Sequence, residues 1–158
     1  PRRSMTTTVD TNVLVYASDA GAPEHERAQA LLQHLAAGPD LVVLLWPTLL
    51  GCLRIVTHPS ICGKPLPFDV ARGNVDALLA LPHVRAAGET AEFWRAFALV
   101  TTEVPVRGNL VPDAQLVTLM RTHGVHHIWS RDRDLRRFDA VTVSDPFDDR
   151  YASGFPTR

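Results

Sequence analysis

The sequence predicts an α/β protein with three layers, in which helices cover both faces of a mainly parallel sheet. Two observations support this fold class. Short β-prone runs alternate along the chain with stretches in which apolar residues recur every three or four positions. One run, Leu41–Leu45, is apolar throughout, which is typical of a strand buried on both faces and therefore of a parallel sheet.

The first part of the chain predicts two strands and three helices. Residues 6–10 form a β-prone run, and the next helix can be capped by Thr11 or Asn12. A helix over residues 24–37 ends at Gly38-Pro39. After the buried strand at 41–45, Pro47 fits the first turn of a helix that runs to residue 55 or 56.

The second part continues the alternation after a loop rich in proline and glycine at residues 60–68. A helix at 69–81 and a strand at 83–86 come first, followed by a helix that contains Phe93, is capped by Glu89 or Thr90 and ends at Pro105. The next helix, at 113–123, has Pro112 at its start and Gly124 after it. The last elements are a strand at 126–130, a helical turn at 135–138 and a strand at 141–143.

The length of 158 residues predicts one domain, residues 5–158, and residues 1–4 before Met5 look like the remnant of an expression tag. The net charge of −1 excludes a protein that holds nucleic acid by bulk positive charge, so such contacts must be local. No stretch is long and apolar enough to cross a bilayer. The two cysteines, Cys52 and Cys62, form no disulfide framework, so we expect a reducing cytoplasm.

Three aspartates follow the ends of expected elements. Asp10 and Asp132 come directly after strands, and Asp113 stands near the start of a helix. Ligands of such sheets bind outside the carboxyl ends of the strands, so the three carboxylates can converge at one edge. Taken singly, Asp10 can also be a helix cap, and Asp113 can simply stabilise a helix dipole.

Clustered carboxylates repel one another unless a cation compensates their charge. With only oxygen ligands the expected cation is hard, Mg²⁺ with Mn²⁺ as a possible substitute. Such an ion can activate water for attack on a phosphodiester. The residues alone therefore favour a metal-dependent nuclease with Asp10, Asp113 and Asp132 as its catalytic and metal-binding residues.

Further polar residues near these aspartates are auxiliary candidates. Asn12 and Asn109 can orient the aspartates or simply form turns, and Asp134 can assist the metal or belong to a solvated charged turn. Arg131 and Arg133 can bind RNA phosphates or form a solvated face.

Four ordered segments carry a resemblance to a known family. The segment Val9-Asp10-Thr11-Asn12 resembles the opening motif of PIN-domain nucleases. The later segments resemble the remaining motifs of the VapC toxins of VapBC toxin–antitoxin pairs; they begin at Trp46-Pro47, at Asn109-Leu110 with Asp113, and at Ser130-Arg131-Asp132. The resemblance covers nearly the whole chain in the right order.

This resemblance implies a PIN-like fold and a metal-dependent endoribonuclease toxin that cuts structured RNA such as tRNA or rRNA. It also implies a homodimer and a cognate antitoxin that blocks the acidic site. An apolar groove for the antitoxin is expected near Leu49, Leu53, Val56 and Phe68.

One position departs from the family pattern, since Gly51 stands where the second motif usually has glutamate. Glycine supplies no ligand, so one alternative is a catalytically impaired PIN domain that binds RNA or antitoxin without efficient cleavage. A second alternative is an aspartate-based phosphatase or a receiver domain. The phosphatase needs an aspartate where this chain has Asn12, and the receiver needs a pair of acids ahead of its phosphorylated aspartate, which the sequence lacks.

Overall fold

Five parallel strands form one sheet in the order β3-β2-β1-β4-β5 in the computed structural model, which describes residues 4–156. The strands are β1 (Thr6–Val9), β2 (Leu41–Leu45), β3 (Val84–Ala87), β4 (His127–Trp129) and β5 (Thr142–Ser144). The expected tag remnant, residues 1–4, lies outside the described residues except for Ser4.

Helices connect the strands, as the sequence pattern predicts. They are α1 (Thr11–Ser18), α2 (His25–Ala36), α3 (Trp46–Val56), α4 (Phe68–Leu79), α5 (Phe93–Glu103) and α6 (Leu110–Thr122), with short 3₁₀ turns η1 (Arg133–Arg137) and η2 (Asp149–Tyr151). No helix within residues 4–156 is long and apolar enough to cross a membrane.

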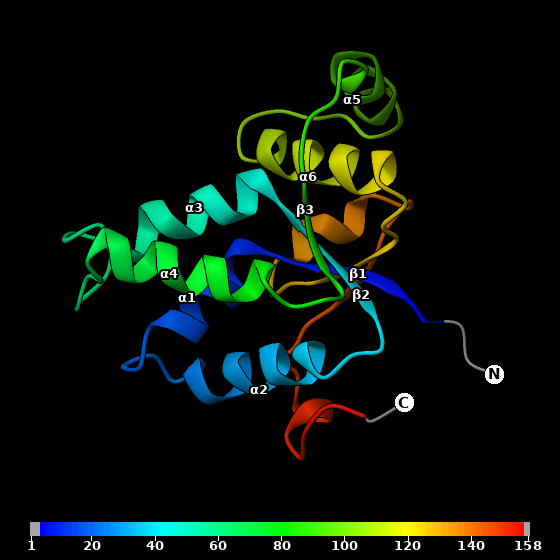
Figure 1. Ribbon diagram of the computed structural model, residues 1–158. Helices are drawn as coiled ribbons and strands as arrows, with labels where there is room; N and C mark the ends of the chain where they lie inside the picture. Colours follow the sequence, from blue (N-terminus) through cyan, green and yellow to red (C-terminus); the bar gives the residue numbers. More distant parts are fainter. Residues whose placement is uncertain (1–3, 157–158) are drawn as a thin grey trace.

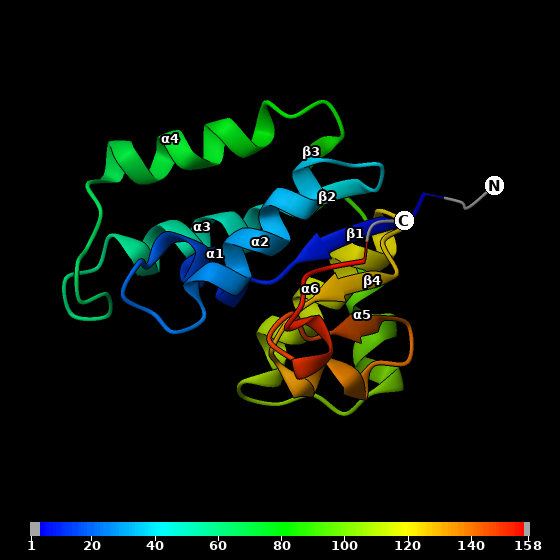
Figure 2. The same ribbon diagram turned by 90° about the horizontal axis from the view of Figure 1, so that it is seen from below.

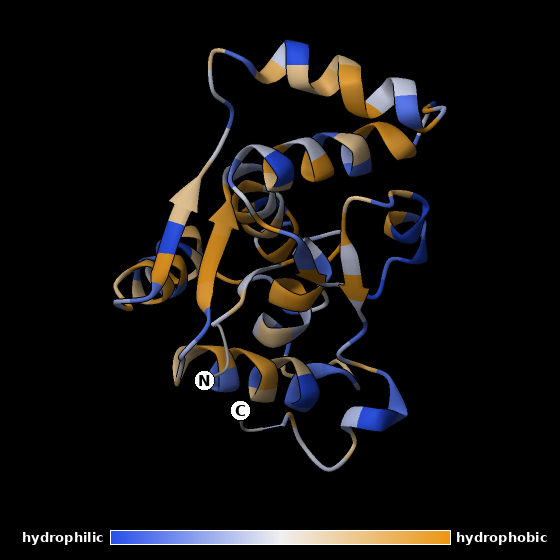
Figure 3. Ribbon diagram, turned by 90° about the vertical axis from the view of Figure 1, so that its right-hand side faces the viewer, coloured by the Kyte–Doolittle hydropathy of each residue, from blue (hydrophilic) through white to orange (hydrophobic). Residues whose placement is uncertain are grey.

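The helices divide into two groups, one on each face of the sheet. Strand β2 shows the reason, because alternate side chains of a strand point to opposite faces. Val42 and Leu44 pack with α1 to α4, whereas Val43 and Leu45 pack with α5 and α6. Figures 1 and 2 show these two helix groups on either side of the sheet, and in Figure 3 strand β2 is coloured as hydrophobic along its length. The three-layer α/β prediction is confirmed.

Strand order reverses beside β1. Strand β2 lies on one side of β1 and β4 on the other, and the Asp10 N–H donates to the Trp129 carbonyl at 2.9 Å. Ligands of open parallel sheets bind at such a switch point, outside the carboxyl ends of the strands. The fold therefore places its candidate site at the ends of β1 and β4.

Helix starts are where the sequence prediction was wrong in detail. Asp10 caps α1, which confirms its alternative interpretation as a helix cap, and the caps expected at Thr11 or Asn12 are wrong. Helix α6 begins at Leu110, so Pro112 is its third residue instead of its first. Proline fits either position, because the first turn of a helix needs no backbone donor there.

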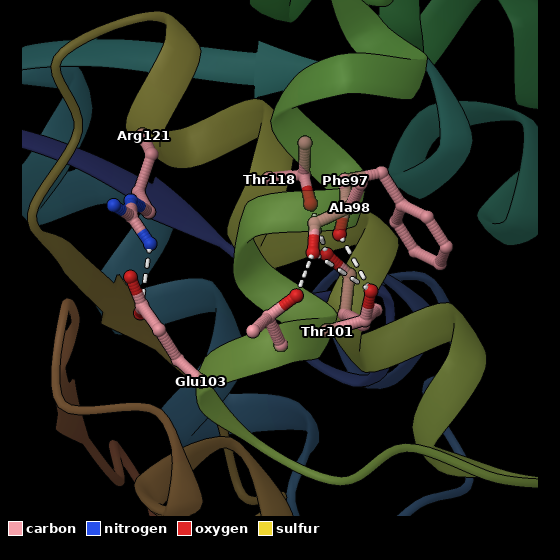
Figure 4. Close-up of polar contacts among 8 residues, drawn as sticks. Phe97, Ala98, Thr101, Glu103, Thr118 and Arg121 are labelled. Atoms are coloured by element: carbon pink, nitrogen blue, oxygen red, sulfur yellow. Dashed lines mark hydrogen bonds and ion pairs between the residues drawn. The ribbon is translucent and has the colours of Figure 1, made fainter.

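Helix α5 packs against α6 and also starts differently from the prediction. Its cap position is Glu92, and Thr90 only accepts a hydrogen bond from the Glu92 N–H at 3.3 Å. At the far ends of the two helices, Arg121 and Glu103 form an ion pair at 3.0 Å, and Thr101 donates to backbone carbonyls of its own helix (Figure 4).

The segment after β5 covers one end of the core, which the sequence analysis did not predict. Its aromatic rings of Tyr151 and Phe155 lie 5.3 and 5.4 Å from the Trp129 ring. Cys52 and Cys62 are both free and buried, and burial raises the pKa of the Cys52 thiol to about 11, which keeps it protonated.

Candidate metal centre

Asp10 is the first side chain beyond β1, and its carboxylate is held on both oxygens. Oδ1 accepts a hydrogen bond from the Thr11 N–H at 2.7 Å, which caps α1, and Oδ2 accepts from Ser130 Oγ at 2.6 Å. Burial raises the pKa of Asp10, the two hydrogen bonds lower it, and the charge of Asp132 raises it. The net effect is a raised pKa. A cation beside Asp10 would oppose this effect, because it stabilises the charged carboxylate.

Ser130 connects the two strand ends. It is the first residue beyond β4 and is almost completely buried. Its Oγ donates to Asp10 and also accepts the Asp132 N–H at 2.9 Å, so one hydroxyl fixes both acidic segments. Ser130 was not among the residues predicted from the sequence to serve the site. The signal that identifies Ser130 is its position. It directly follows β4, the parallel neighbour of the strand that Asp10 follows.

Three carboxylates meet beside this connection. Oxygen atoms of Asp113, Asp132 and Asp134 all lie within 4.8 Å of one another. Asp113 comes from the first turn of α6, while Asp132 caps η1 by accepting the Asp134 N–H at 2.9 Å. Asp134 is exposed and also pairs with Arg137 at 3.5 Å. Asp134 therefore belongs to this group of three neighbouring carboxylates, although its side chain is exposed.

The charges of these groups reinforce one another. The pKa of Asp113 rises to about 7, chiefly because burial disfavours its charged form and next because of the charge of Asp132. A hydrogen bond that protonated Asp113 donates to the Asp132 carboxylate, together with the charges of Asp10 and Asp134, raises it further. The four aspartates therefore lie close enough for their charges to interact, and together they create one region of negative potential.

This donor set fits a hard divalent cation. Mg²⁺ holds oxygen ligands at about 2.0–2.1 Å, so ligands on opposite sides of the ion lie about 4.2 Å apart. A spread of up to 4.8 Å between the carboxylates of Asp113, Asp132 and Asp134 needs only a small side-chain rotation or one intervening water. The residues present therefore suit such an ion.

The two asparagines differ in their surroundings. The Oδ1 atom of Asn12 is buried and has no hydrogen-bond partner among the described residues, so a water at the site can satisfy it. Asn109 is exposed at the cap position of α6, four residues before Asp113, and its side chain makes no capping bond there. Of the two asparagines, only Asn12 has a buried side-chain atom without a hydrogen-bond partner among the described residues.

The two arginines also differ. Arg131 forms an ion pair with Glu24 at 3.0 Å, and its guanidinium lies 4.6 Å from the centre of the Phe147 ring. These contacts hold Arg131 in the fold. Arg133 is exposed at the start of η1, between Asp132 and Asp134, which leaves it accessible to a phosphate.

Gly51 faces the acidic edge from α3. A Cβ placed on Gly51 would lie 3.4 Å from Thr11 Oγ1 and 3.5 Å from Thr11 Cγ2, and Thr11 directly follows Asp10. A longer side chain at position 51 would therefore start toward the site. Glycine itself adds no ligand.

Comparison with known proteins gives consistent similarities. A model of the PIN domain matches residues 7–141. The chain is 49% identical to Ribonuclease VapC48 of Mycobacterium tuberculosis over 90% of this chain and 99% of that protein. It is 33% identical to Ribonuclease VapC43 of the same species, over 89% and 95% of the two chains.

Two solved structures share the fold. Mycobacterium tuberculosis VapC20, described as a Sarcin-Ricin loop cleaving toxin, superposes with a TM-score of 0.59 at 21% identity, over 82% of this chain and 92% of that one. VapBC2 from Rickettsia felis, solved with a DNA fragment from its promoter, gives a TM-score of 0.63 at 14% identity, over 89% and 98%.

Proposed function

This chain belongs to the PIN-domain family and resembles its VapC ribonucleases throughout, and we propose that it cleaves RNA with a divalent cation held by Asp10, Asp113 and Asp132. One observation carries the proposal. Carboxylates of Asp113, Asp132 and Asp134 lie within 4.8 Å of one another at the sheet edge where Asp10 follows β1.

The side chains at this edge of the sheet have different roles in the proposed reaction. Ser130 holds the Asp10 carboxylate and the backbone of Asp132 in a fixed relation, so only small side-chain rotations are needed to receive an ion. A bound Mg²⁺, or Mn²⁺ in its place, supplies an activated water and stabilises the leaving oxygen. Asp134 compensates for the missing acid at position 51 by adding a third carboxylate next to Asp113 and Asp132.

The substrate we propose is structured RNA, such as tRNA or rRNA, and the reaction is hydrolysis of one phosphodiester bond. The similar VapC20 is a Sarcin-Ricin loop cleaving toxin, which supports this class of substrate. Arg133 offers the local positive charge that a protein with a net charge of −1 requires for phosphate binding.

The alternative function is an impaired PIN domain that binds RNA or antitoxin without efficient cleavage. Gly51 favours this alternative, because it supplies no carboxylate. Asp134 favours cleavage, because it restores a third carboxylate to the group that contains Asp113 and Asp132.

A cognate antitoxin is the protein partner we propose, and an apolar hollow of about 430 Å³ offers its docking surface. The hollow lies among α1, α2, α3 and α4, and Leu53 and Val56 line it as expected. Leu49 is completely buried, so this part of the expected groove is wrong. Phe68 is exposed, as expected of a docking surface, but lies outside the lining of this hollow. Complexes from Rickettsia felis and Klebsiella pneumoniae show that proteins of this fold assemble with antitoxins.

We further propose a homodimer, following the family resemblance, which light scattering on the purified chain can test. The free, buried thiols of Cys52 and Cys62 suit the reducing cytoplasm expected from the sequence.

The testing experiment is cleavage of total cellular RNA by the purified, antitoxin-free protein. We expect cleavage with Mg²⁺ or Mn²⁺ and none in excess chelator. Asp132→Asn should abolish it, whereas Asp76→Asn, an exposed position on α4, should not. Metal-independent cleavage, or full activity of Asp132→Asn, would contradict the proposal; binding without any cleavage would favour the impaired alternative.

A further inference from the structure

Trp46 is an unusual side chain for its position. It is the first residue of α3, directly after the completely buried Leu45, yet 45% of its surface is exposed. The other tryptophans serve different places, since Trp129 is buried in the core and Trp94 is 74% exposed on α5. A large apolar ring left half open at a sheet edge requires an explanation.

Strand order places Trp46 at the same edge of the sheet as the acidic site. Strands β1 and β2 are parallel neighbours in the sheet, so Asp10, just beyond β1, and Trp46, just beyond β2, lie at the same edge of the sheet. The hydrogen bond from Thr11 Oγ1 to the Thr48 carbonyl, at 3.4 Å, shows that this part of α3 does lie against Thr11. Trp46 is therefore two residues along α3 from the carbonyl that contacts Thr11, the residue that follows Asp10.

Gly88 fixes the indole from the other side. Leu45 pairs with Ala87 at the ends of β2 and β3, so Trp46 and Gly88 are the first residues beyond two neighbouring strands. A Cβ on Gly88 would lie only 2.6 Å from Trp46 Cδ1, which shows that the ring packs directly on the glycine backbone.

The backbone under the ring is itself anchored to α6, which carries Asp113. His123 Nε2 donates to the Gly88 carbonyl at 2.8 Å, and Gln115 Nε2 donates to Glu89 Oε1 at 2.8 Å. Trp46 therefore presents a ring that is held on a fixed backbone and open on one side.

We propose that Trp46 is the stacking platform for an unpaired base of the RNA, next to the phosphodiester that the aspartates engage. The inference rests on the proposed function and adds a positioning residue to it. Proteins that recognise RNA stack unstacked bases on aromatic rings, and such stacking needs no positive charge. This suits a chain whose net charge of −1 gives little general attraction to RNA.

The test is steady-state cleavage, by the full chain in Mg²⁺, of a short RNA hairpin that carries unpaired bases in its loop. Trp46→Ala should raise KM about five- to a hundredfold, the range expected for one lost stacking contact, with kcat changed little. Trp46→Phe should restore most of the affinity, while Trp46→Leu, which keeps apolar packing without an aromatic face, should not. Trp94→Ala is the matched control and should behave as the wild type.

Two further readouts separate stacking from a merely structural role. Gly88→Ala forces the indole to shift, so it should raise KM in the presence of Trp46 but have little added effect beside Trp46→Ala. The salt dependence of KM should keep its slope in Trp46→Ala, because no phosphate contact is lost. Far-UV circular dichroism checks that each variant folds.

The outcomes distinguish this inference from the proposed function. A wild type that neither binds nor cuts RNA would overturn both. A wild type that cuts RNA while Trp46→Leu or folded Trp46→Ala keeps its KM would overturn the stacking role alone. Unchanged KM together with weaker binding of an antitoxin would assign the exposed ring to a protein contact and would equally overturn the inference.

Discussion

Ser130 Oγ lies 2.6 Å from Asp10 Oδ2, and this hydrogen bond joins the carboxyl ends of two neighbouring parallel strands. The same oxygen accepts the Asp132 N–H, so the aspartates that end β1 and follow β4 share one buried partner. Because Ser130 is almost completely buried, water cannot take the place of its hydroxyl without rearrangement.

Ser130→Ala should therefore weaken both stability and metal binding. Removing the hydroxyl leaves the Asp10 carboxylate and the Asp132 N–H each short of a partner, which costs about 1–3 kcal/mol of the free energy of unfolding. The pKa of Asp10 should rise further, because the Ser130 hydrogen bond lowers it. Chemical denaturation and calorimetric Mn²⁺ titration measure the two effects. Ser60→Ala, at an exposed loop position, is the control, and equal metal affinity in Ser130→Ala would contradict the assigned role.

Asp113 predicts a dependence of stability on pH. Its pKa is about 7 in the fold and lies near 3.8 when unperturbed. Between these values the folded state holds a proton that the unfolded state has lost, so stability of the metal-free protein should fall as pH rises from about 4 to about 7. Asp113→Asn should flatten this part of the curve relative to the wild type.

Metal should reverse that dependence, since a cation stabilises the ionised carboxylates of Asp113 and Asp132. Thermal melts with and without Mg²⁺ should differ little at about pH 5 and clearly at about pH 8. A shift in Tm with Mg²⁺ that is as large in acid as in base would show that the ion binds elsewhere.

Gly51→Glu should strengthen the centre. The new side chain starts beside Thr11, at the acidic edge, and one added carboxylate contact worth about 1.4 kcal/mol corresponds to tenfold tighter binding of Mg²⁺ or Mn²⁺. RNA cleavage should rise with it. Helix propensity also improves by several tenths of a kcal/mol, so Gly73→Glu on α4, where a Cβ meets open space, is the matched control. Metal affinity that is unchanged in Gly51→Glu would place position 51 outside the site.

The apolar hollow predicts a variant that separates partner binding from catalysis. Ala77 is exposed on α4 and lines the hollow, so Ala77→Trp should fill it without disturbing the core. Binding of the cognate antitoxin should weaken at least about tenfold, a loss of about 1.4 kcal/mol, while RNA cleavage by the free protein stays unchanged. Ala80→Trp, just past the end of α4, is the control; retained antitoxin binding in Ala77→Trp would assign the partner to another surface.

Much of the fold was predictable because local patterns and the final structure agree. The unbroken apolar run of β2 requires cover on both faces, and the structure divides Val42 and Val43 between two cores. The start of α6 was not predictable, because Pro112 suits any position in a first turn. The packing of Tyr151 and Phe155 on Trp129 was missed because it joins segments with no local signal for each other.

The candidate site was predictable only in part. Asp10, Asp113 and Asp132 follow from their places at element ends. The role of Ser130 depends on which strand neighbours β1, and local sequence does not specify strand order. Asp134 had two interpretations from sequence, and its nearness to Asp113 follows from how α6 packs against η1.

The most direct test of the metal centre is a crystal structure of the protein soaked in Mn²⁺, with the ion located by its anomalous scattering. We predict a peak bounded by the carboxylates of Asp113 and Asp132, with Asp10 bound to the ion directly or through one water. A fully occupied Mn²⁺ ion that contacts neither Asp113 nor Asp132 would contradict the account.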